Sequence, residues 1–340
     1  MARSPATRVI SVDPADPDPA TLDSAARLLK DGGLVAFATE TVYGLGAIAT
    51  SPAAVARIFA AKGRPAVNPL IVHVEGVAEA RACASDWPEE AVILTKNFWP
   101  GPLTIVVPRS AVIPDIVTAG ANTVALRCPR GAVARGLIER VELPIAAPSA
   151  NSSNRISPTR AEHVLADLDG KIDLIIDTGP TTVGLESTVL DLSVATPRIL
   201  RPGPISRADL ERVLGGRSVL DHEPRESPAR PASPGQMPIH YAPRTPAYHV
   251  ASIEKLVAFQ SLGSTVLIVI GAHTVAGDLP VRCQFVLESP ESASIALYDV
   301  LHRCDALAPA AIVVVLPPDE PKWQAVRDRL LRACRPLADR

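Results

Sequence analysis

Cysteine is scarce and irregularly placed in this 340-residue chain. The five cysteines are odd in number and form no C-x-x-C pair: Cys83, Cys128, Cys283, Cys304 and Cys334. This spacing excludes a disulfide framework and a zinc ribbon, and it favours a reducing compartment such as the cytoplasm.

Long apolar runs are also missing. The longest, such as residues 266–270, fall far below the roughly 18 residues that a membrane span needs. The first 20 residues carry Asp-Pro repeats and no apolar stretch of signal-peptide length. We therefore expect a soluble, unsecreted, cytoplasmic protein that contacts no membrane.

Neither charge sign dominates. Lys and Arg number 34 against 36 Asp and Glu, a net charge of -2, and only 4% of residues are aromatic. RNA sites usually show a basic stripe or an aromatic stacking platform. There is thus no sequence-wide electrostatic reason to bind nucleic acid, and any RNA contact would have to be local.

Three common catalytic motifs are absent. The chain contains no Walker A, H-E-x-x-H or G-x-S-x-G string. Ordinary P-loop NTPases, zincins and α/β-hydrolases are therefore disfavoured.

Apolar residues and prolines are plentiful instead. Apolar residues make up 47% of the chain, enough for a sizeable core and about two domains. Seven of the 34 prolines fall within residues 221–246, which have little apolar periodicity and read as a semi-rigid linker. We expect a larger domain over residues 1–220 and a small C-terminal domain over residues 247–340.

Hydrophobic periodicity predicts α/β architecture on both sides of the linker. Before it, we expect helices at 21–30, 53–61 and 132–141, and strands at 34–38, 70–74, 103–107, 123–126, 172–176 and 187–192. After it, we expect a helix at 253–262, a strand at 265–270, a helix at 295–306, a strand at 311–316 and a helix at 323–334. The second series is typical of a small domain with a parallel sheet.

The first strand leads into residues 39–49, which contain a G-x-G-x-x-A string. We reject an NAD site, because the region about 20 residues on is basic, with Lys62 and Arg64, where an acidic ribose ligand is needed. A glycine-rich turn packing a helix on a strand remains the alternative. The polar residues 39–41 favour a ligand site, since α/β sheets bind ligands at strand ends.

Several charged and polar residues have two possible explanations each. Lys62 and Arg64 suit phosphate, but they also suit a solvated helix C-terminus. A single His73 at a strand end favours a core histidine over a ligand site. Arg127 closes an apolar strand and therefore needs an anionic partner, either a structural carboxylate or a ligand carboxylate.

Three further segments are rich in polar groups or rigid turns. Residues 146–159 (AAPSANSSNRISPT) could line a polar site. Residues 184–189 (GLESTV) are similarly rich in polar side chains. Residues 198–204 (RILRPGP) supply another cation in what we expect to be a rigid turn.

Eight strings in this order resemble the YrdC-domain family, and within it the long, two-domain threonylcarbamoyl-AMP synthases. They are TETVYGLG, KGRPAVNPLIVHV, WPGPLTIVV, VALRCP, APSANSSNRISPT, GLESTVLDL, RILRPGPI and SPGQMPIHYAP. The resemblance runs from about residue 24 to 204, returns at 233–243 and is faint thereafter. Residues 321–327 (PKWQAVR) replace a glycine-rich turn that long members often carry.

The resemblance implies a fold and a reaction. The fold would be a twisted mixed α/β sheet with a concave, positively lined cavity, followed by a smaller Rossmann-like α/β domain that supports the linker. The enzyme would be a nucleotidyltransferase that forms L-threonylcarbamoyladenylate and pyrophosphate from L-threonine, bicarbonate or CO₂, and ATP. Mg²⁺ would be carried mainly by the ATP phosphates. A separate transferase would modify adenosine 37 of tRNAs reading ANN codons, so direct tRNA binding is not required.

The resemblance also implies site residues. Threonine would be held by Thr41, His73, Arg127, the backbone of Ala147, and Ser187. ATP would be held by Lys62, Arg64, Asn68, Thr123, Ser149, Asn151, Ser157, Arg201 and Tyr241. Lys62 and Arg64 would be catalytic by offsetting phosphate charge, and Tyr241 of the linker would fold back as a lid.

Two other functions stay open at this point. One is a non-catalytic RNA-binding module, which the charge balance and the few aromatics disfavour. The other is a relative that acts on carbamoyl phosphate, although such relatives usually carry zinc-finger or acylphosphatase segments that are absent here.

Overall fold

The computed structural model describes residues 6–221, 240–252, 256, 264–271 and 281–337. The chain packs as two compact units. The first comprises Met1–Ser153 and Pro158–Met237, and the second comprises Asn154–Ser157 and Pro238–Arg340. Most of the predicted linker lies outside the described residues. The short segment Asn154–Ser157, far from the linker in sequence, groups with the second unit.

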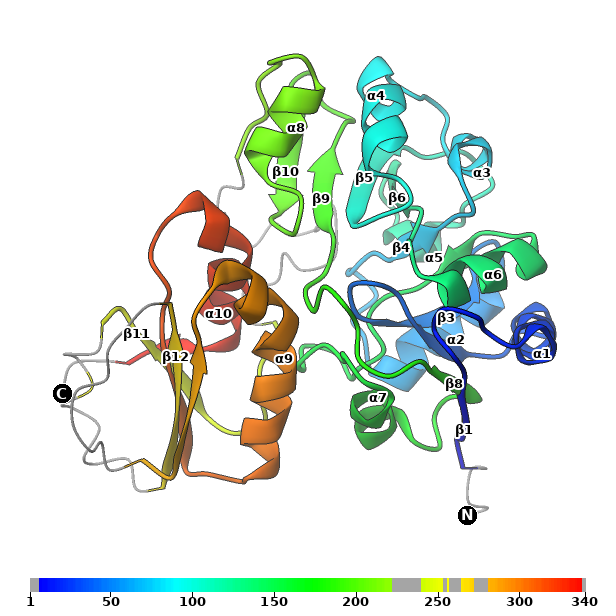
Figure 1. Ribbon diagram of the computed structural model, residues 1–340. Coiled ribbons are helices and arrows are strands. Elements are labelled where there is room, and N and C mark those ends of the chain that lie inside the picture. Colours follow the sequence, from blue (N-terminus) through cyan, green and yellow to red (C-terminus); the bar gives the residue numbers. More distant parts are fainter. Residues whose placement is uncertain (1–5, 222–239, 253–255, 257–263, 272–280, 338–340) are drawn as a thin grey trace. The chain divides into compact units, whose positions relative to one another are not determined.

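A mixed sheet of ten strands forms the first unit (Figure 1), in the order β1-β8-β2-β3-β7-β4-β6-β5-β9-β10. The strands are β1 (Arg8–Ser11), β2 (Val35–Ala38), β3 (Tyr43–Ile48), β4 (Ile71–His73), β5 (Leu103–Pro108), β6 (Thr123–Arg127), β7 (Ile145–Ala146), β8 (Leu174–Asp177), β9 (Thr188–Asp191) and β10 (Arg198–Arg201). Parallel pairs such as β4 with β6 alternate with antiparallel pairs such as β5 with β6. The predicted mixed α/β sheet is confirmed.

Helices cover both faces of this sheet. They are α1 (Pro19–Lys30), α2 (Pro52–Lys62), α3 (Val77–Cys83), α4 (Glu89–Phe98), α5 (Asp115–Thr118), α6 (Ala132–Val141), α7 (Ala161–Leu168) and α8 (Arg207–Val213). Successive residues of a strand point to opposite faces. Accordingly, Phe37 of β2 joins the core cluster of α1 and α6, whereas its neighbour Ala36 joins the cluster of α2.

The glycines of residues 39–49 lie in a strand, so the alternative of a glycine-rich turn is wrong. Tyr43–Ile48 forms β3, antiparallel to β2. Gly46 is needed there because a Cβ would stand 2.7 Å from Cε1 of Phe37. The rigid turn expected at 198–204 is likewise shorter, because the backbone of Arg198–Arg201 pairs with β9 as strand β10.

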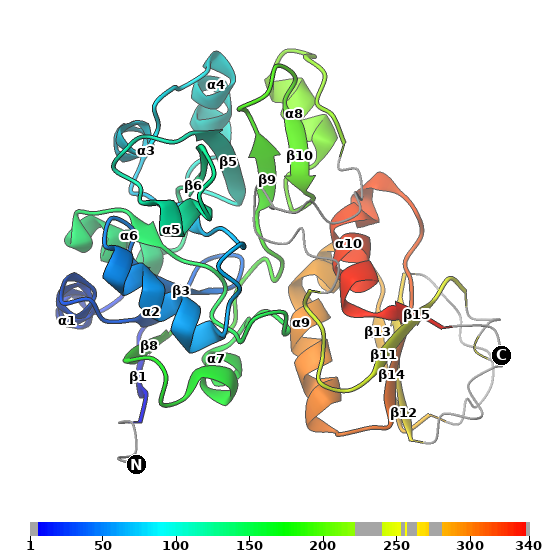
Figure 2. The same cartoon turned by 180° about the vertical axis from the view of Figure 1, so that it is seen from behind.

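The second unit contains a five-stranded sheet in the order β13-β12-β14-β11-β15, all of whose pairs are parallel, as predicted. The strands are β11 (Ala247–Val250), β12 (Thr265–Ile270), β13 (Cys283–Leu287), β14 (Ala311–Val315) and β15 (Arg335–Pro336). Helices α9 (Pro290–Ala306) and α10 (Gln324–Ala333) lie on one face of it (Figures 1 and 2). The helix expected at 253–262 falls almost wholly outside the described residues.

No helix in the described parts of the chain combines the length and the apolar character that crossing a membrane requires.

A close backbone approach after β10 generates a stability prediction. A Cβ on Gly203 would meet the backbone nitrogen of Thr188 at 2.4 Å, and backbone atoms cannot move aside as a flexible side chain can. We expect Gly203→Ala to lower the free energy of unfolding by about 1–3 kcal/mol, measured by urea denaturation.

Gly76→Ala is the matched control. A Cβ there meets nothing within 4 Å, and the φ of -175° is ordinary extended backbone. We expect its effect to stay within about 0.5 kcal/mol. Equal denaturation midpoints for the two variants would contradict the steric explanation.

Candidate functional site

Two cations mark the end of helix α2. The helix stops at Gly63, which adopts a left-handed conformation with φ of 59°, and Arg64 follows directly. The Nζ atom of Lys62 donates to the carbonyl oxygen of Ser149 at 2.5 Å and to that of Asn151. Lys62 is only 4% exposed, so the solvated helix terminus considered for it is wrong.

Arg64 is buried beside Lys62 and shapes the next loop. Its Nε donates to the carbonyl of Asn68 at 3.0 Å, and its Nη2 donates to the carbonyl of Pro69 at 2.7 Å. Burial, with the nearby charge of Arg64, lowers the pKa of Lys62 well below its ordinary value, although Asp167 opposes this. A cation in this state gains from an incoming anion, because the anion restores the charged form.

Arg127 ends strand β6 in a buried polar group. Its Nη2 lies 2.7 Å from Oε1 of Glu40, and its Nη1 donates to Oγ1 of Thr41 at 2.9 Å. Burial by itself would raise the pKa of Glu40, but the Arg127 charge and the Arg130 backbone N–H hold it below its ordinary value. The structural partner left open for Arg127 is therefore Glu40.

Several buried polar atoms in the described part of the chain have no hydrogen-bond partner. Among them are Nδ1 of His73 and both amide atoms of Asn68. Burial and the Arg127 charge lower the pKa of His73 to about 3, so its ring is neutral near pH 7. Buried polar atoms normally have partners, and such atoms point to a place where a ligand supplies them.

Ser187 stands at the start of β9 in a third polar group. Its Oγ is 2.7 Å from Oγ1 of Thr104, and Arg201 donates to its backbone oxygen from Nε at 3.1 Å. The close approach of Gly203 to this backbone leaves no room for a larger residue.

Strand register brings the predicted threonine residues together. His73 of β4 pairs with Arg127 of β6, and Ile105 of β5 pairs with Leu126, which sets Thr104 at the level of Arg127. Thr104 in turn bonds Ser187. Thr41 joins through Arg127, and the Ala147 N–H donates to the carbonyl of Ile71 on β4 at 2.9 Å.

The predicted ATP residues fall into separate places. Lys62 contacts Ser149 and Asn151, and Arg64 contacts Asn68. Thr123 starts β6, four residues from Arg127, hence about 13 Å away at roughly 3.3 Å per residue. Arg201 belongs to the Ser187 group instead.

Ser157 and Tyr241 belong to the second unit, and each is described there by its own contacts. Tyr241 is 1% exposed, with its ring stacked on Tyr298 at 5.7 Å and the Arg329 guanidinium 5.2 Å from its centre. Its role as a lid remains a prediction.

Sequence reasoning noted Glu40 only as one polar residue among residues 39–41 and assigned no chemistry to Thr104. The motif strings contain both, so the signal was present, but pairing with Arg127 and Ser187 depends on tertiary contacts. No three His, Cys, Asp or Glu side chains gather as a metal site in the described ranges.

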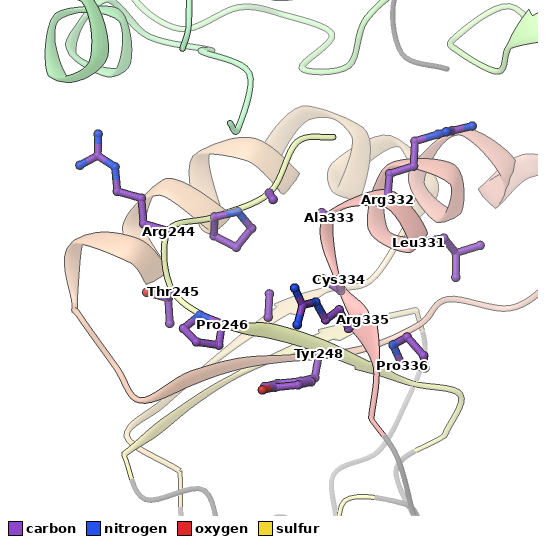
Figure 3. A pocket seen from close by; sticks show the side chains of 13 residues that line it. Arg244, Thr245, Pro246, Tyr248, Leu331, Arg332, Ala333, Cys334, Arg335 and Pro336 are labelled. Atoms are coloured by element: carbon purple, nitrogen blue, oxygen red, sulfur yellow. The ribbon is translucent and has the colours of Figure 1, made fainter. Parts of the chain in front are cut away.

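The second unit has a cavity of about 460 Å³ that none of the predicted site residues lines. Figure 3 shows Arg335 reaching into it between β11 and β15, whereas Arg244 and Arg332 point outward. Cys334 lies in its wall, and burial raises the pKa of that thiol to about 12. The cavity therefore offers a surface arginine and an unreactive thiol.

The buried ion pair generates a pH prediction. Because the folded-state pKa of Glu40 is lowered, its contribution to stability is present above the ordinary carboxyl pKa and is lost as pH falls. We expect Glu40→Gln to cost about 3–5 kcal/mol at pH 7, since it leaves a buried arginine without its counter-charge. The variant should then lose less stability than the wild type between pH 7 and pH 4, measured by thermal unfolding.

Asp23→Asn is the matched control, because Asp23 pairs with Arg140 at 2.8 Å with its side chain 58% exposed. We expect that variant to stay within about 1 kcal/mol of the wild type. Equal losses for the two variants would contradict the special role of the Glu40–Arg127 pair.

Two family models match adjoining parts of the chain. The Sua5/YciO/YrdC family model, described as "Telomere recombination", matches residues 27–203, and that of the threonylcarbamoyl-AMP synthase C-terminal domain matches residues 205–334. Threonylcarbamoyl-AMP synthase of Pyrococcus abyssi is 42% identical over 91% of this chain and 92% of its own length, and that of Bacillus subtilis is 41% identical over 91% of both.

A solved structure agrees over nearly the whole length. The crystal structure of P. abyssi Sua5 complexed with L-threonine matches with a TM-score of 0.88 and 38% identity, covering 98% of this chain and all of that one. Both structured units and the ordered strings of the first one are thus shared. The chain belongs to the threonylcarbamoyl-AMP synthase family, in its long form with a C-terminal domain.

Proposed function

We propose that this chain forms L-threonylcarbamoyladenylate, with ATP phosphates at the Lys62–Arg64 pair and threonine near Arg127. The observation that carries the proposal is the burial of two adjacent cations, Lys62 at 4% and Arg64 at 8% exposure. Burying two positive charges side by side is costly, and an anion of high charge such as triphosphate offsets that cost.

The placement of threonine near Arg127 is supported by the N–H donors that remain on its guanidinium group. Its described contacts with Gly101, Thr41 and Glu40 use three of the five guanidinium N–H groups. Two donors are left for a carboxylate, and Nδ1 of His73 on the neighbouring strand needs a partner as well. The relative solved with L-threonine supports this choice of substrate.

The reaction asks for positioning more than for acid–base groups. The deprotonated threonine amine adds CO₂, from bicarbonate or directly, to give a carbamate. A carbamate oxygen then forms a bond to the α-phosphorus, the bond to the β-phosphate bridging oxygen breaks, and pyrophosphate leaves. Lys62 and Arg64 stabilise the charge that develops on the departing phosphates, and the site holds two anions that repel each other in water.

Mg²⁺ enters this proposal with ATP, since phosphate oxygens and water suit it better than the cations and hydroxyls gathered here. The product is a mixed anhydride that hydrolyses readily, so water must be excluded after it forms. Tyr241 of the linker is our candidate for that closing group. The product passes to a separate transferase that modifies tRNA.

Pyrophosphate release tests the function directly. Purified protein receives ATP, Mg²⁺ and bicarbonate with and without L-threonine, and the adenylate is detected by mass. We expect release only with threonine. Release with carbamoyl phosphate but not with threonine would instead support the carbamoyl-phosphate alternative, and tight RNA binding without release would support a binding module.

Substitution of Lys62 and Arg64 tests whether these two cations bind the ATP phosphates. We expect Lys62→Ala and Arg64→Ala each to lower kcat for threonine-dependent release by about 100-fold, as loss of a charge-stabilising donor usually does. Arg64→Lys should recover only part, because it keeps the charge and loses the planar fork.

Lys96→Ala is the matched control, because Lys96 also lies in the last turn of a helix, α4, but is exposed. Its rate should equal that of the wild type. Wild-type rates for both Lys62→Ala and Arg64→Ala would refute the phosphate assignment.

A further inference from the structure

The segment Asn154–Ser157, which we call the tether, packs within the second unit. The backbone N–H of Ala242 donates to the carbonyl of Asn154 at 2.9 Å, and Arg155 pairs with Ala242 in a parallel bridge. Nη1 of Arg155 also donates to the carbonyl of Pro243 at 3.3 Å. The start of the tether is therefore bonded to the end of the linker motif.

Helix α9 holds the other end of the tether. Nε2 of His302 lies 3.2 Å from the carbonyl oxygen of Ser157. A carbonyl oxygen can only accept a hydrogen bond, so Nε2 carries the proton and the contact fixes the ring tautomer. His302 thus holds the backbone of Ser157, a predicted ATP residue.

The linker residues that receive the tether are themselves rigidly held. Tyr241 has φ of 61°, a conformation that is a clear outlier for a bulky residue and costs about 1–3 kcal/mol. Such strain persists only where neighbouring residues enforce it. The Tyr241 ring is stacked on Tyr298 of α9 at 5.7 Å, and the guanidinium of Arg329 of α10 lies 5.2 Å from the ring centre. Helices α9 and α10 therefore both fix the backbone next to Ala242.

The chain on either side of the tether is bonded within the first unit. Ser153, just before it, donates its N–H to the carbonyl of Lys62 at 2.9 Å. Pro158, just after it, accepts from the N–H of Tyr43 at 2.9 Å. Only four residues separate these anchors, so a change in the tether is transmitted to the residues that flank it.

We propose that His302 and Arg155 are positioning residues for the nucleotide, through which the second unit sets the affinity for ATP. The proposal rests on the proposed function, because it takes Ser157 as an ATP ligand. The C-terminal domain would then set the affinity for ATP in addition to supporting the linker. Because coupling between binding and attachment is reciprocal, ATP must also strengthen the tether.

His302→Ala removes the donor to Ser157 and tests the proposal in the full-length chain. We expect the KM for ATP to rise by about 3- to 10-fold, the range for losing one neutral hydrogen bond. The KM for threonine and kcat should stay within about twofold, since the Arg127 group has no part in the tether. His302→Gln, whose amide can donate from a similar position, should recover most of the affinity.

Arg303→Ala is the matched control on the same helix. Its side chain is 61% exposed and its guanidinium packs over Phe285 of β13 at 4.9 Å, away from the tether contact. We expect wild-type KM values for it. Unchanged KM for ATP in His302→Ala, or equal rises in both KM values with a fall in thermal stability, would overturn the positioning role.

Hydrogen exchange at the Ala242 amide, measured by mass spectrometry, separates this inference from the proposed function. In the wild type ATP should slow that exchange, and in His302→Ala exchange should be faster with a smaller ATP effect. Exchange that does not respond to His302→Ala would refute the tether, whatever the activity. If the wild type showed no threonine-dependent pyrophosphate release, the proposed function and the positioning role would both be refuted. The exchange rates would still show whether His302 holds the tether in place.

Discussion

Compensation of buried positive charge is the constraint on which the first unit depends. Lys62, Arg64, Arg127 and Arg201 are each less than 10% exposed, in a domain whose sheet would otherwise be an apolar core. Each meets the cost differently, through backbone carbonyls for Lys62 and Arg64, a carboxylate for Arg127, and the Ser187 group for Arg201. Lys62 and Arg64 are close enough for the charge of Arg64 to lower the pKa of Lys62, so an incoming anion would stabilise both.

The sheet order explains why Arg127 and the Ser187 group, which includes Arg201, come together although they are distant in sequence. Strands β4, β6, β5 and β9 are neighbours, and the register sets His73, Arg127 and Thr104 at one level. Because β5 and β6 are antiparallel, the start of β5 lies beside the end of β6. One of the polar atoms without a partner in the described residues, Nδ1 of His73, belongs to this arrangement.

The second unit acts on the backbone of two predicted ATP residues, Ser157 and Tyr241. Its parallel sheet and two helices contain no predicted catalytic side chain, yet they hold the backbone on both sides of Tyr241 and at Ser157. A domain without chemistry of its own can thus influence a reaction by ordering a loop whose freedom would otherwise be lost on binding. Such an arrangement also accounts for a strained conformation kept at Tyr241.

The sequence by itself determined the α/β class, the parallel C-terminal sheet, about half of the helices and strands, and the family, because periodicity and ordered motif strings are local properties. It left a glycine-rich turn open as an alternative for residues 39–49, since glycine within a strand is explained only by the ring of Phe37 that packs against Gly46. It predicted that Arg127 needs an anion, but only tertiary structure supplied Glu40, which lies 87 positions earlier in the chain. Ion-pair partners and the attachment of Asn154–Ser157 join residues distant in sequence, and such contacts follow from strand register and packing, which no local pattern encodes.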